Sequence, residues 1–148
     1  MSTYEDDVRQ ALKAEFEAGQ LREVGKAADI FGLLAKVYPV SGSKIDWKLV
    51  PGAVERPEES KSLQSTRFVE FFDEMGSRFE LHGLVLYAGD SATDFALAAA
   101  IDVMRRALPE LIEIPQHHYF VGPNCAWCMC RTIEGDMGFG RAIRASHH

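Results

Sequence analysis

The feature that most constrains the fold is the segment HHYFVGPNCAWCMCRTI, residues 117–133. Its two halves, HHYFV and AWCMCRTI, are short runs rich in aromatic and β-branched residues, which favour strands. Gly122, Pro123 and Asn124 lie between them and are strong turn signals. The segment therefore predicts a β-hairpin in the C-terminal part of the chain.

The remaining elements follow from hydrophobic periodicity. Alternation of apolar and charged residues predicts a half-buried strand over 44–50, and an apolar run predicts a buried strand over 81–88. Three glycines in EGDMGFGRAIR, residues 134–144, favour a loop or a bulged edge strand. Apolar stripes at helical spacing predict four helices, over 4–18, 21–37, 62–78 and 93–111.

This order of elements predicts an α+β fold, in which about four helices pack against a small mixed or antiparallel sheet that ends in the C-terminal hairpin; an α/β fold is the alternative. A length of 148 residues favours a single domain over 1–148, with SHH at 146–148 typical of a purification-tag remnant. We therefore exclude His147 and His148 from any chemistry.

Composition favours a soluble, cytoplasmic protein. Hydrophobic residues make up 47% of the chain and charged residues 26%, with no apolar run of ~18 residues. The acidic, amphipathic start MSTYEDDVRQALKAEF does not resemble a secretory signal. Three clustered cysteines are an odd number and form a poor disulfide framework, which fits a reducing compartment.

Charge is distributed unevenly along the chain. The net charge is −6; residues 1–60 and 61–115 carry −3 and −4, whereas 116–148 carry +1. The resulting field repels nucleic acid and anionic lipid and favours a basic partner. Simple solubility explains mild acidity equally well.

The cysteine cluster C-x2-C-x-C raises the question of a metal or redox site. A structural zinc site needs four converging ligands, commonly from two C-x2-C pairs. Here strand alternation places Cys128 and Cys130 on one face with Thr132, and leaves Cys125 in the turn. A redox C-x-x-C needs a helix start behind it, which this segment lacks. We expect no metal and no cofactor; Cys125, Cys128, Cys130 and His118 are the alternative metal-binding or catalytic set.

Other catalytic motifs are missing from the sequence. It contains no G-x-S-x-G, no phosphate-binding loop, no G-x-G-x-x-G after a strand and no H-E-x-x-H. His82 lies in an apolar run that is typical of a structural histidine. We therefore expect a protein that is not an enzyme and that acts through its surface.

The segment PQHHYFVGPNCAWCMCRTIEGDMGFGRA resembles the C-terminal part of some bacterial immunity proteins, which neutralise polymorphic or contact-dependent growth-inhibition toxins. The resemblance covers about a fifth of the chain, and no residue role transfers from it. It implies a cytoplasmic protein that binds a toxin domain. Toxins that attack nucleic acid are often basic, so an acidic inhibitor would associate with them quickly.

From the residues themselves, we predict that the partner binds acidic side chains on one helix, in the glycine-rich tail and beside Trp47. These candidates are Asp46, Glu70, Asp73, Glu74, Glu134 and Asp136. Two alternatives stay open: a small metal- or ligand-binding enzyme that uses the cysteine–histidine hairpin, and a regulatory module that binds a host protein.

Overall fold

A computed structural model describes residues 3–42, 44–57 and 64–142 of the chain. The predicted tag remnant, the first residues of the predicted helix 62–78 and part of the loop after Pro57 lie outside these residues. None of the helices described is both long and apolar enough to cross a membrane.

The fold is α+β, as predicted, and its main sheet is antiparallel throughout, so the α/β alternative is wrong. The helices of the described residues are α1 (Tyr4–Ala11), α2 (Lys13–Glu17), α3 (Ala27–Val37), α4 (Gln64–Arg78) and α5 (Ile101–Leu111). The strands of the main sheet are β1 (Leu21–Lys26), β4 (Val54–Arg56), β5 (Leu84–Gly89), β6 (Phe95–Ala100), β7 (His118–Val121), β8 (Trp127–Arg131) and β9 (Met137–Arg141). A separate two-residue pair joins β2 (Val40–Ser41) and β3 (Lys44–Ile45).

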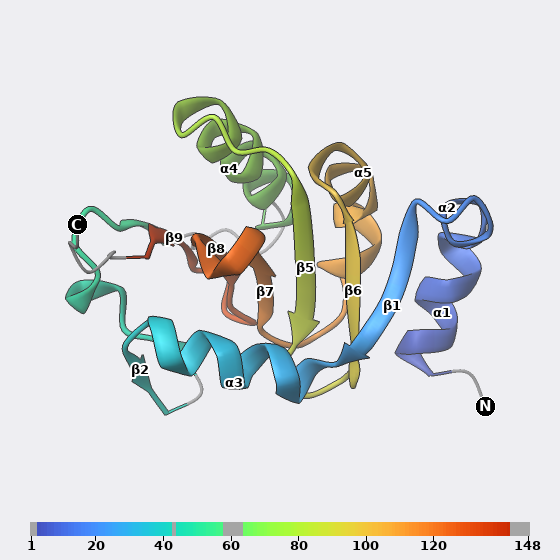
Figure 1. Ribbon diagram of the computed structural model, residues 1–148, viewed down its shortest axis with the longest axis horizontal. Helices are drawn as coiled ribbons and strands as arrows, with labels where there is room; N and C mark the ends of the chain where they lie inside the picture. The colour runs from blue at the N-terminus through green and yellow to red at the C-terminus, as the bar shows by residue number, and fades with distance from the viewer. Residues whose placement is uncertain (1–2, 43, 58–63, 143–148) are drawn as a thin grey trace.

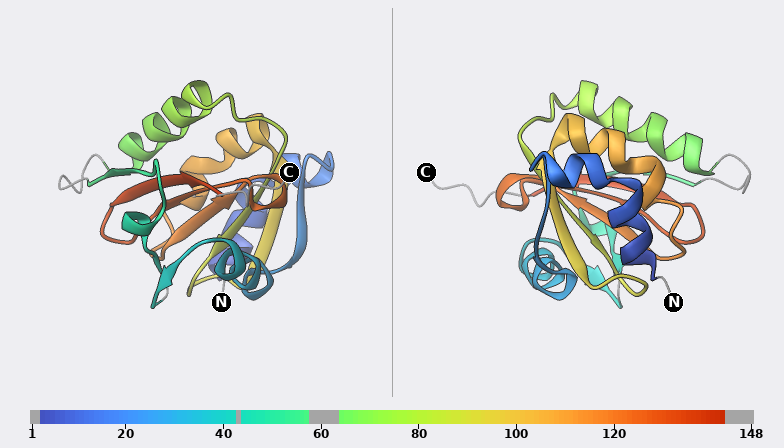
Figure 2. Two further views of the ribbon diagram at one scale, coloured as in Figure 1. Left: turned by 60° about the vertical axis from the view of Figure 1, so that its left-hand side comes forward. Right: turned by 90° about the vertical axis from the view of Figure 1, so that its right-hand side faces the viewer.

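The seven strands lie in the order β1-β6-β5-β7-β8-β9-β4. Helices cover both faces of this sheet (Figures 1 and 2). On one face, α1, α4 and α5 bury a core that includes Phe68, Phe120 and Met129. On the other, α3 and the 3-10 turn Trp47–Leu49 bury a second core that includes Tyr119, Cys128 and Cys130.

Several predicted elements are confirmed. The hairpin forms, since β7 pairs with β8 from His118–Arg131 to Val121–Cys128. The helix 62–78 appears as α4 over its described part, with its aromatic stripe buried. The N-terminal helix is divided at Leu12 into α1 and α2 and ends before Gly19, which takes a left-handed φ of 75°.

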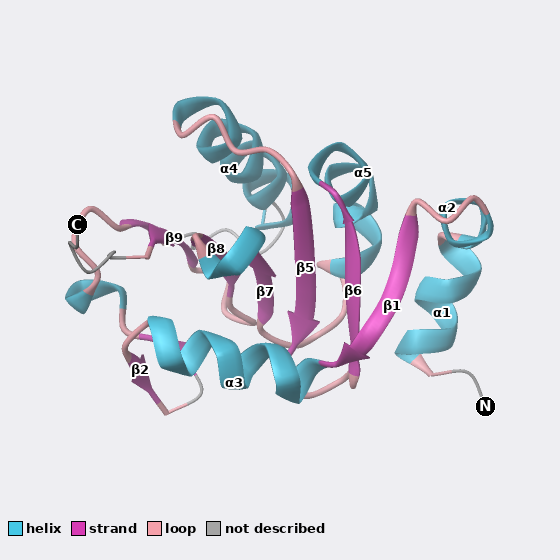
Figure 3. Cartoon of the chain, viewed as in Figure 1, coloured by secondary structure: helices cyan, strands magenta, loops and turns pink. Residues whose placement is uncertain are grey.

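Two predicted helices are wrong in their first halves (Figure 3). Residues 21–26 form the edge strand β1, bulged between Glu23 and Gly25, and the helix begins only at Ala27. Residues 95–100, FALAAA, form the inner strand β6 between β1 and β5. Because β6 is covered on both faces, small alanines suit it despite their helical propensity.

Two predicted strands also need correction. Only Lys44 and Ile45 of the segment 44–50 pair as a strand, and Leu49, which alternation placed on the same face as Ile45, is 65% exposed. In the glycine-rich tail, residues 134–136 form a loop as predicted, but Met137–Arg141 form β9, an inner strand between β8 and β4 and not a bulged edge; residues 143 and 144 lie outside the described residues. Trp47 explains the glycines of β9, since a Cβ at Gly138 or Gly140 would overlap the indole.

Candidate functional site

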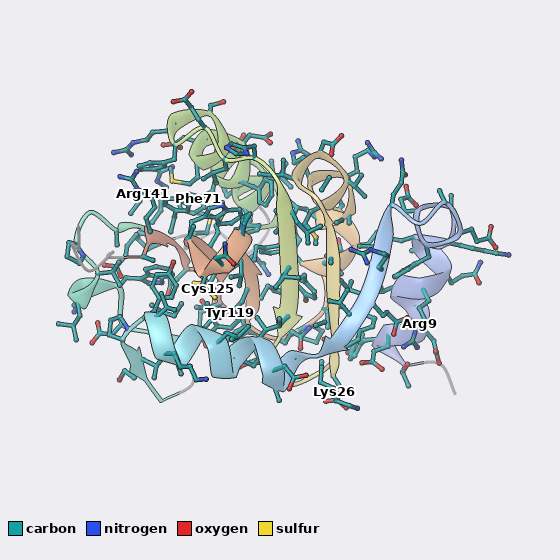
Figure 4. All side chains as sticks on the ribbon, in the orientation of Figure 1. Arg9, Lys26, Phe71, Tyr119, Cys125 and Arg141 are labelled. Atoms are coloured by element: carbon teal, nitrogen blue, oxygen red, sulfur yellow. The ribbon has the colours of Figure 1, made fainter. Side chains whose placement is uncertain are left out.

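The three cysteines belong to the core on the α3 side of the sheet. As predicted, Cys128 and Cys130 share one face of β8, while Trp127 and Met129 face the opposite core. Cys125 lies in the turn but, unlike our prediction, packs in the same cluster as the other two sulfurs. Figure 4 shows Cys125 on this side of the molecule, near Tyr119.

Burial disfavours the thiolate form of these cysteines. It raises the pKa of all three, that of Cys130 to about 12 and that of Cys128 well above its ordinary value. The Trp47 indole N–H donates to Cys130 Sγ at 3.3 Å, which offsets only part of the effect of burial on Cys130. Since the thiolate is the nucleophile and the metal ligand, the sulfurs here act as packing groups.

His118 lies on the other face of the sheet from the sulfurs. Its neighbour Tyr119 packs in the core of the cysteines, whereas His118 stacks on Tyr87, a residue of the α4–α5 core. Tyr87 donates its hydroxyl proton to Nδ1 of His118 at 2.7 Å, and Nε2–H donates to the Ile114 carbonyl at 2.9 Å. Burial, helped by the charge of Arg131, lowers the pKa of His118 to about 3.

The alternative metal-binding or catalytic set is therefore not brought together. Cys128 and Cys130 point to one side of the sheet and His118 to the other, because β7 and β8 pair in register and side chains alternate along each. Within the residues described, no group of three or more His, Cys, Asp and Glu side chains could hold a metal ion.

The histidine belongs to a buried polar network that holds one end of the sheet. The Gln116 side-chain oxygen accepts from the backbone N–H groups of Ser91, Ala92 and Thr93 at 2.8–3.2 Å. Its amide nitrogen donates to Tyr87 and to Thr93. This network fixes residues 90–94, the turn that joins β5 to β6, against the start of β7.

Four of the six predicted partner-binding acids are already paired with cations of this chain. Glu70 accepts from Arg67, Asp73 accepts from Nε and Nη2 of Arg105, Glu74 binds Arg56, and Glu134 binds Lys44. Asp46 instead caps the 3-10 turn, accepting from the backbone N–H of Lys48 at 3.2 Å. These side chains stabilise contacts within the fold and do not form one patch.

Asp136 is exposed and lines a cavity of about 400 Å³ on the α3 side of the sheet. Residues from β3, β4, β7 and β8 also line it, among them Lys44, Arg56, Tyr119 and Cys130. Glu134 and Glu74 each neutralise one of its two cations. Of the predicted acids, Asp136 lines this cavity, and Glu134 and Glu74 are paired with cations that line it.

A second concave feature, which the sequence did not reveal, lies between α1 and the end of α5. Asp7, Glu110 and Glu113 line a cleft of about 280 Å³ with Tyr4, above the buried side chains of Val8 and Ile114. All three carboxylates are exposed, and none forms an ion pair in the part of the chain that the structure describes. We name this feature the acidic cleft.

Only part of the acidic cleft had a signal in the sequence. Glu110 lies in the predicted helix 93–111, whereas Glu113 lies two residues beyond its end. Their approach to Asp7, more than a hundred residues away, depends on α1 packing beside α5 in the core of Val8 and Leu111. Periodicity within one segment carries no information about that packing.

No protein-family model matches this chain, and no curated protein matches it.

Proposed function

We propose that the protein neutralises a basic protein by binding it, in the manner of the immunity proteins that its C-terminal segment resembles. The partner would be a toxin domain with a cationic surface. The acidic cleft, and not the acids chosen from the sequence, is the surface that we assign to first contact with this partner.

The acidic cleft carries the proposal. The three acids that line it are exposed and form no ion pair among the described residues, although the charge of Arg131 acts on Glu113. A cluster of acids of this kind attracts a basic side chain of a partner, which could pair with them. The apolar floor of Val8 and Ile114, with Tyr4 at 45% exposure, offers the mixed surface typical of protein interfaces.

The state of the thiols and of His118 also favours a binding protein over an enzyme. A general base needs a pKa near the working pH, whereas that of His118 is about 3 and both its ring nitrogens are engaged. A cysteine nucleophile needs a lowered pKa, whereas burial raises the pKa of Cys125, Cys128 and Cys130.

The ligand-binding alternative keeps one supporting observation. The cavity beside Cys130 and Asp136 has a volume of about 400 Å³, within the range of roughly 300–1,000 Å³ typical of small-molecule sites. A small molecule bound there would contact Tyr119 and Cys130 but not His118, which faces the other side of the sheet.

Co-expression tests the proposed function. The C-terminal domain of a large toxin gene immediately upstream of this gene would be expressed with and without the protein, and cell survival measured. We expect protection by the protein and by the triple variant E70Q/D73N/E74Q, whose acids are paired within the chain. The triple variant D7N/E110Q/E113Q removes the same charge from the acidic cleft, and we expect it to protect poorly.

The same experiment can contradict the proposal. Failure to protect from any neighbouring toxin would show that the immunity function is wrong. Equal protection by the two triple variants would show that the acidic cleft is not the binding surface.

A further inference from the structure

A groove between α3 and the β2–β3 pair is the most distinctive unassigned surface of the molecule. Phe31, Leu34 and Ala35 of α3 form one wall, and Ile45 and Tyr119 contribute to the other side. Figure 4 labels Tyr119 beside α3. The groove has a volume of about 270 Å³, smaller than the roughly 300–1,000 Å³ of typical small-molecule sites and suited to a single side chain.

The groove has an exposed apolar side chain at its edge, because Val40 in β2 lines it and is 49% exposed. Leu33 and Val37 of α3 are also exposed, at 47% and 40%, but they do not line the groove. Exposed apolar surface beside a pocket is typical of protein-interaction sites.

Asp90 gives the groove its chemical preference. It is the one charged residue that lines the groove in the described chain, and its side chain is 17% exposed. Its Oδ1 accepts from the His117 backbone N–H at 2.9 Å and from the Ser91 hydroxyl at 3.2 Å. Its Oδ2 lies 3.9 Å from Nε2 of His117, too far for a hydrogen bond, and is thus available to a further donor.

An apolar channel that contains one carboxylate matches a side chain with an apolar stem and a cationic end. Arginine fits better than lysine, because its planar group is weakly hydrated, stacks on aromatic rings and donates in a fork. Phe31, which is half-buried, supplies such a ring, and it packs edge to face on the buried ring of Tyr119 with centroids 5.1 Å apart. We propose that the groove between α3 and β2–β3 receives an arginine side chain of the partner protein, which binds Asp90.

This inference rests on the proposed function and deepens it, because the groove and the acidic cleft lie at the same end of the sheet. Asp90 begins the 90–94 turn, which Gln116 holds through its backbone N–H groups. Ile114, in the floor of the acidic cleft, lies two residues before Gln116. In Figure 1, α3, the β5–β6 turn and the start of α1 all lie along the lower edge. The groove and the acidic cleft lie on opposite faces of the sheet, so a partner that contacts both would have to extend around this edge.

The groove can be tested without the partner. We would titrate the full chain, labelled with nitrogen-15, with n-butylguanidinium, which reproduces the end of an arginine side chain, and with its neutral analogue n-butylurea. We expect amide shifts at Leu34, Ala35, Ile45 and Asp90 with n-butylguanidinium, at a dissociation constant on the order of 1 mM. The neutral analogue should bind at least about tenfold more weakly, since it cannot form the charge-assisted bond.

Variants localise the effect. D90N keeps the acceptor for the His117 N–H but removes the charge, and we expect about a tenfold loss of affinity for n-butylguanidinium. A35L fills the groove and should abolish the shifts, whereas the control A28L changes an exposed alanine of α3 outside the groove and should not.

Each outcome has a distinct meaning. Absence of shifts at the groove, or equal binding of the neutral analogue, would overturn the arginine site even if the protein protects cells from a toxin. Binding of n-butylguanidinium lost in D90N, in a protein that protects from no toxin, would support the groove and contradict the immunity function. A spectrum of D90N that matches the parent apart from residues near position 90 would show that the variant is folded.

Discussion

At the scale of single residues, Trp47 and Gly138 show how one bulky side chain dictates its neighbours. The indole lies against β9, its N–H donates to Cys130 Sγ, and a Cβ at Gly138 would overlap it. The glycine is therefore required by close packing and not by an unusual backbone conformation, since its φ is not positive.

Replacing Gly138 with alanine should destabilise the protein by about 1–3 kcal/mol, because the added methyl group overpacks the core. The matched control is Gly32→Ala in α3, where a Cβ meets nothing within 4 Å. There we expect a gain of about 0.5–1 kcal/mol, since alanine favours helix. Urea unfolding measures both, and equal effects at the two positions would contradict the packing of Trp47 on β9.

His118 makes stability depend on pH. Its pKa is about 3 in the folded protein, below the ordinary value of about 6.5 in the unfolded chain. As the pH falls below 6.5, the unfolded chain binds a proton that the folded protein does not, so stability falls between about pH 6.5 and 3. Stability would instead rise as the pH falls if a carboxylate raised the pKa of His118 in the folded protein. The hydrogen-bond partners of His118 are the Tyr87 hydroxyl and the Ile114 carbonyl, which are not carboxylates.

We expect the parent protein to lose about 2 kcal/mol more stability than His118→Gln between pH 7 and pH 5. Glutamine can keep one acceptor and one donor but does not titrate, so the difference between the two proteins isolates this histidine. Urea unfolding at both pH values is the measurement. Identical pH dependence in the two proteins would mean that His118 is not buried in its neutral form.

At the scale of elements, the side chains of β8 alternate between the two cores of the protein. The thiols of Cys128 and Cys130 face α3, and Trp127 and Met129 face α4 and α5. We expect Cys125, Cys128 and Cys130 to be unreactive towards a thiol reagent at pH 8 in the folded protein and all to react in denaturant. Reaction of one thiol within seconds in the folded state would show that the cavity beside Cys130 admits the reagent.

On α4, the acids serve contacts within the chain. Asp73 pairs with Arg105 of α5, and both side chains are substantially exposed, at 55% and 38%. Exposed pairs contribute little, so Asp73→Asn should change stability by less than about 1 kcal/mol. It should also leave binding of a basic partner unchanged, as measured by calorimetry. A large loss of binding would restore the surface that we first predicted from the sequence.

Elements whose apolar pattern is decided locally were predictable from the sequence. The hairpin β7–β8 follows from its turn residues, and α4 follows from its aromatic stripe. In contrast, FALAAA and LREVGK are strands because β5 and β6 pair with them, so their backbone is set by partners distant in the sequence. The pairing of Glu74 and Asp73 could not be predicted for the same reason, because their cations, Arg56 and Arg105, come from other segments of the chain.

At the scale of the whole molecule, the two surfaces to which we assign binding lie at one end of the sheet. His118 and Gln116 are occupied in holding the 90–94 turn, and the acidic cleft and the α3 groove lie on either side of that turn. In the function that we propose, the net charge of −6 would add a long-range field that attracts a basic partner.

The association rate with the toxin domain identified by co-expression tests this central claim most directly. Measured by stopped flow over a range of salt concentrations, it should fall steeply as salt rises, and D7N/E110Q/E113Q should slow it by about tenfold or more at low salt. The control E70Q/D73N/E74Q, with the same change in net charge, should slow it much less. A rate that does not depend on salt, or an equal effect of the two triple variants, would contradict binding through the acidic cleft.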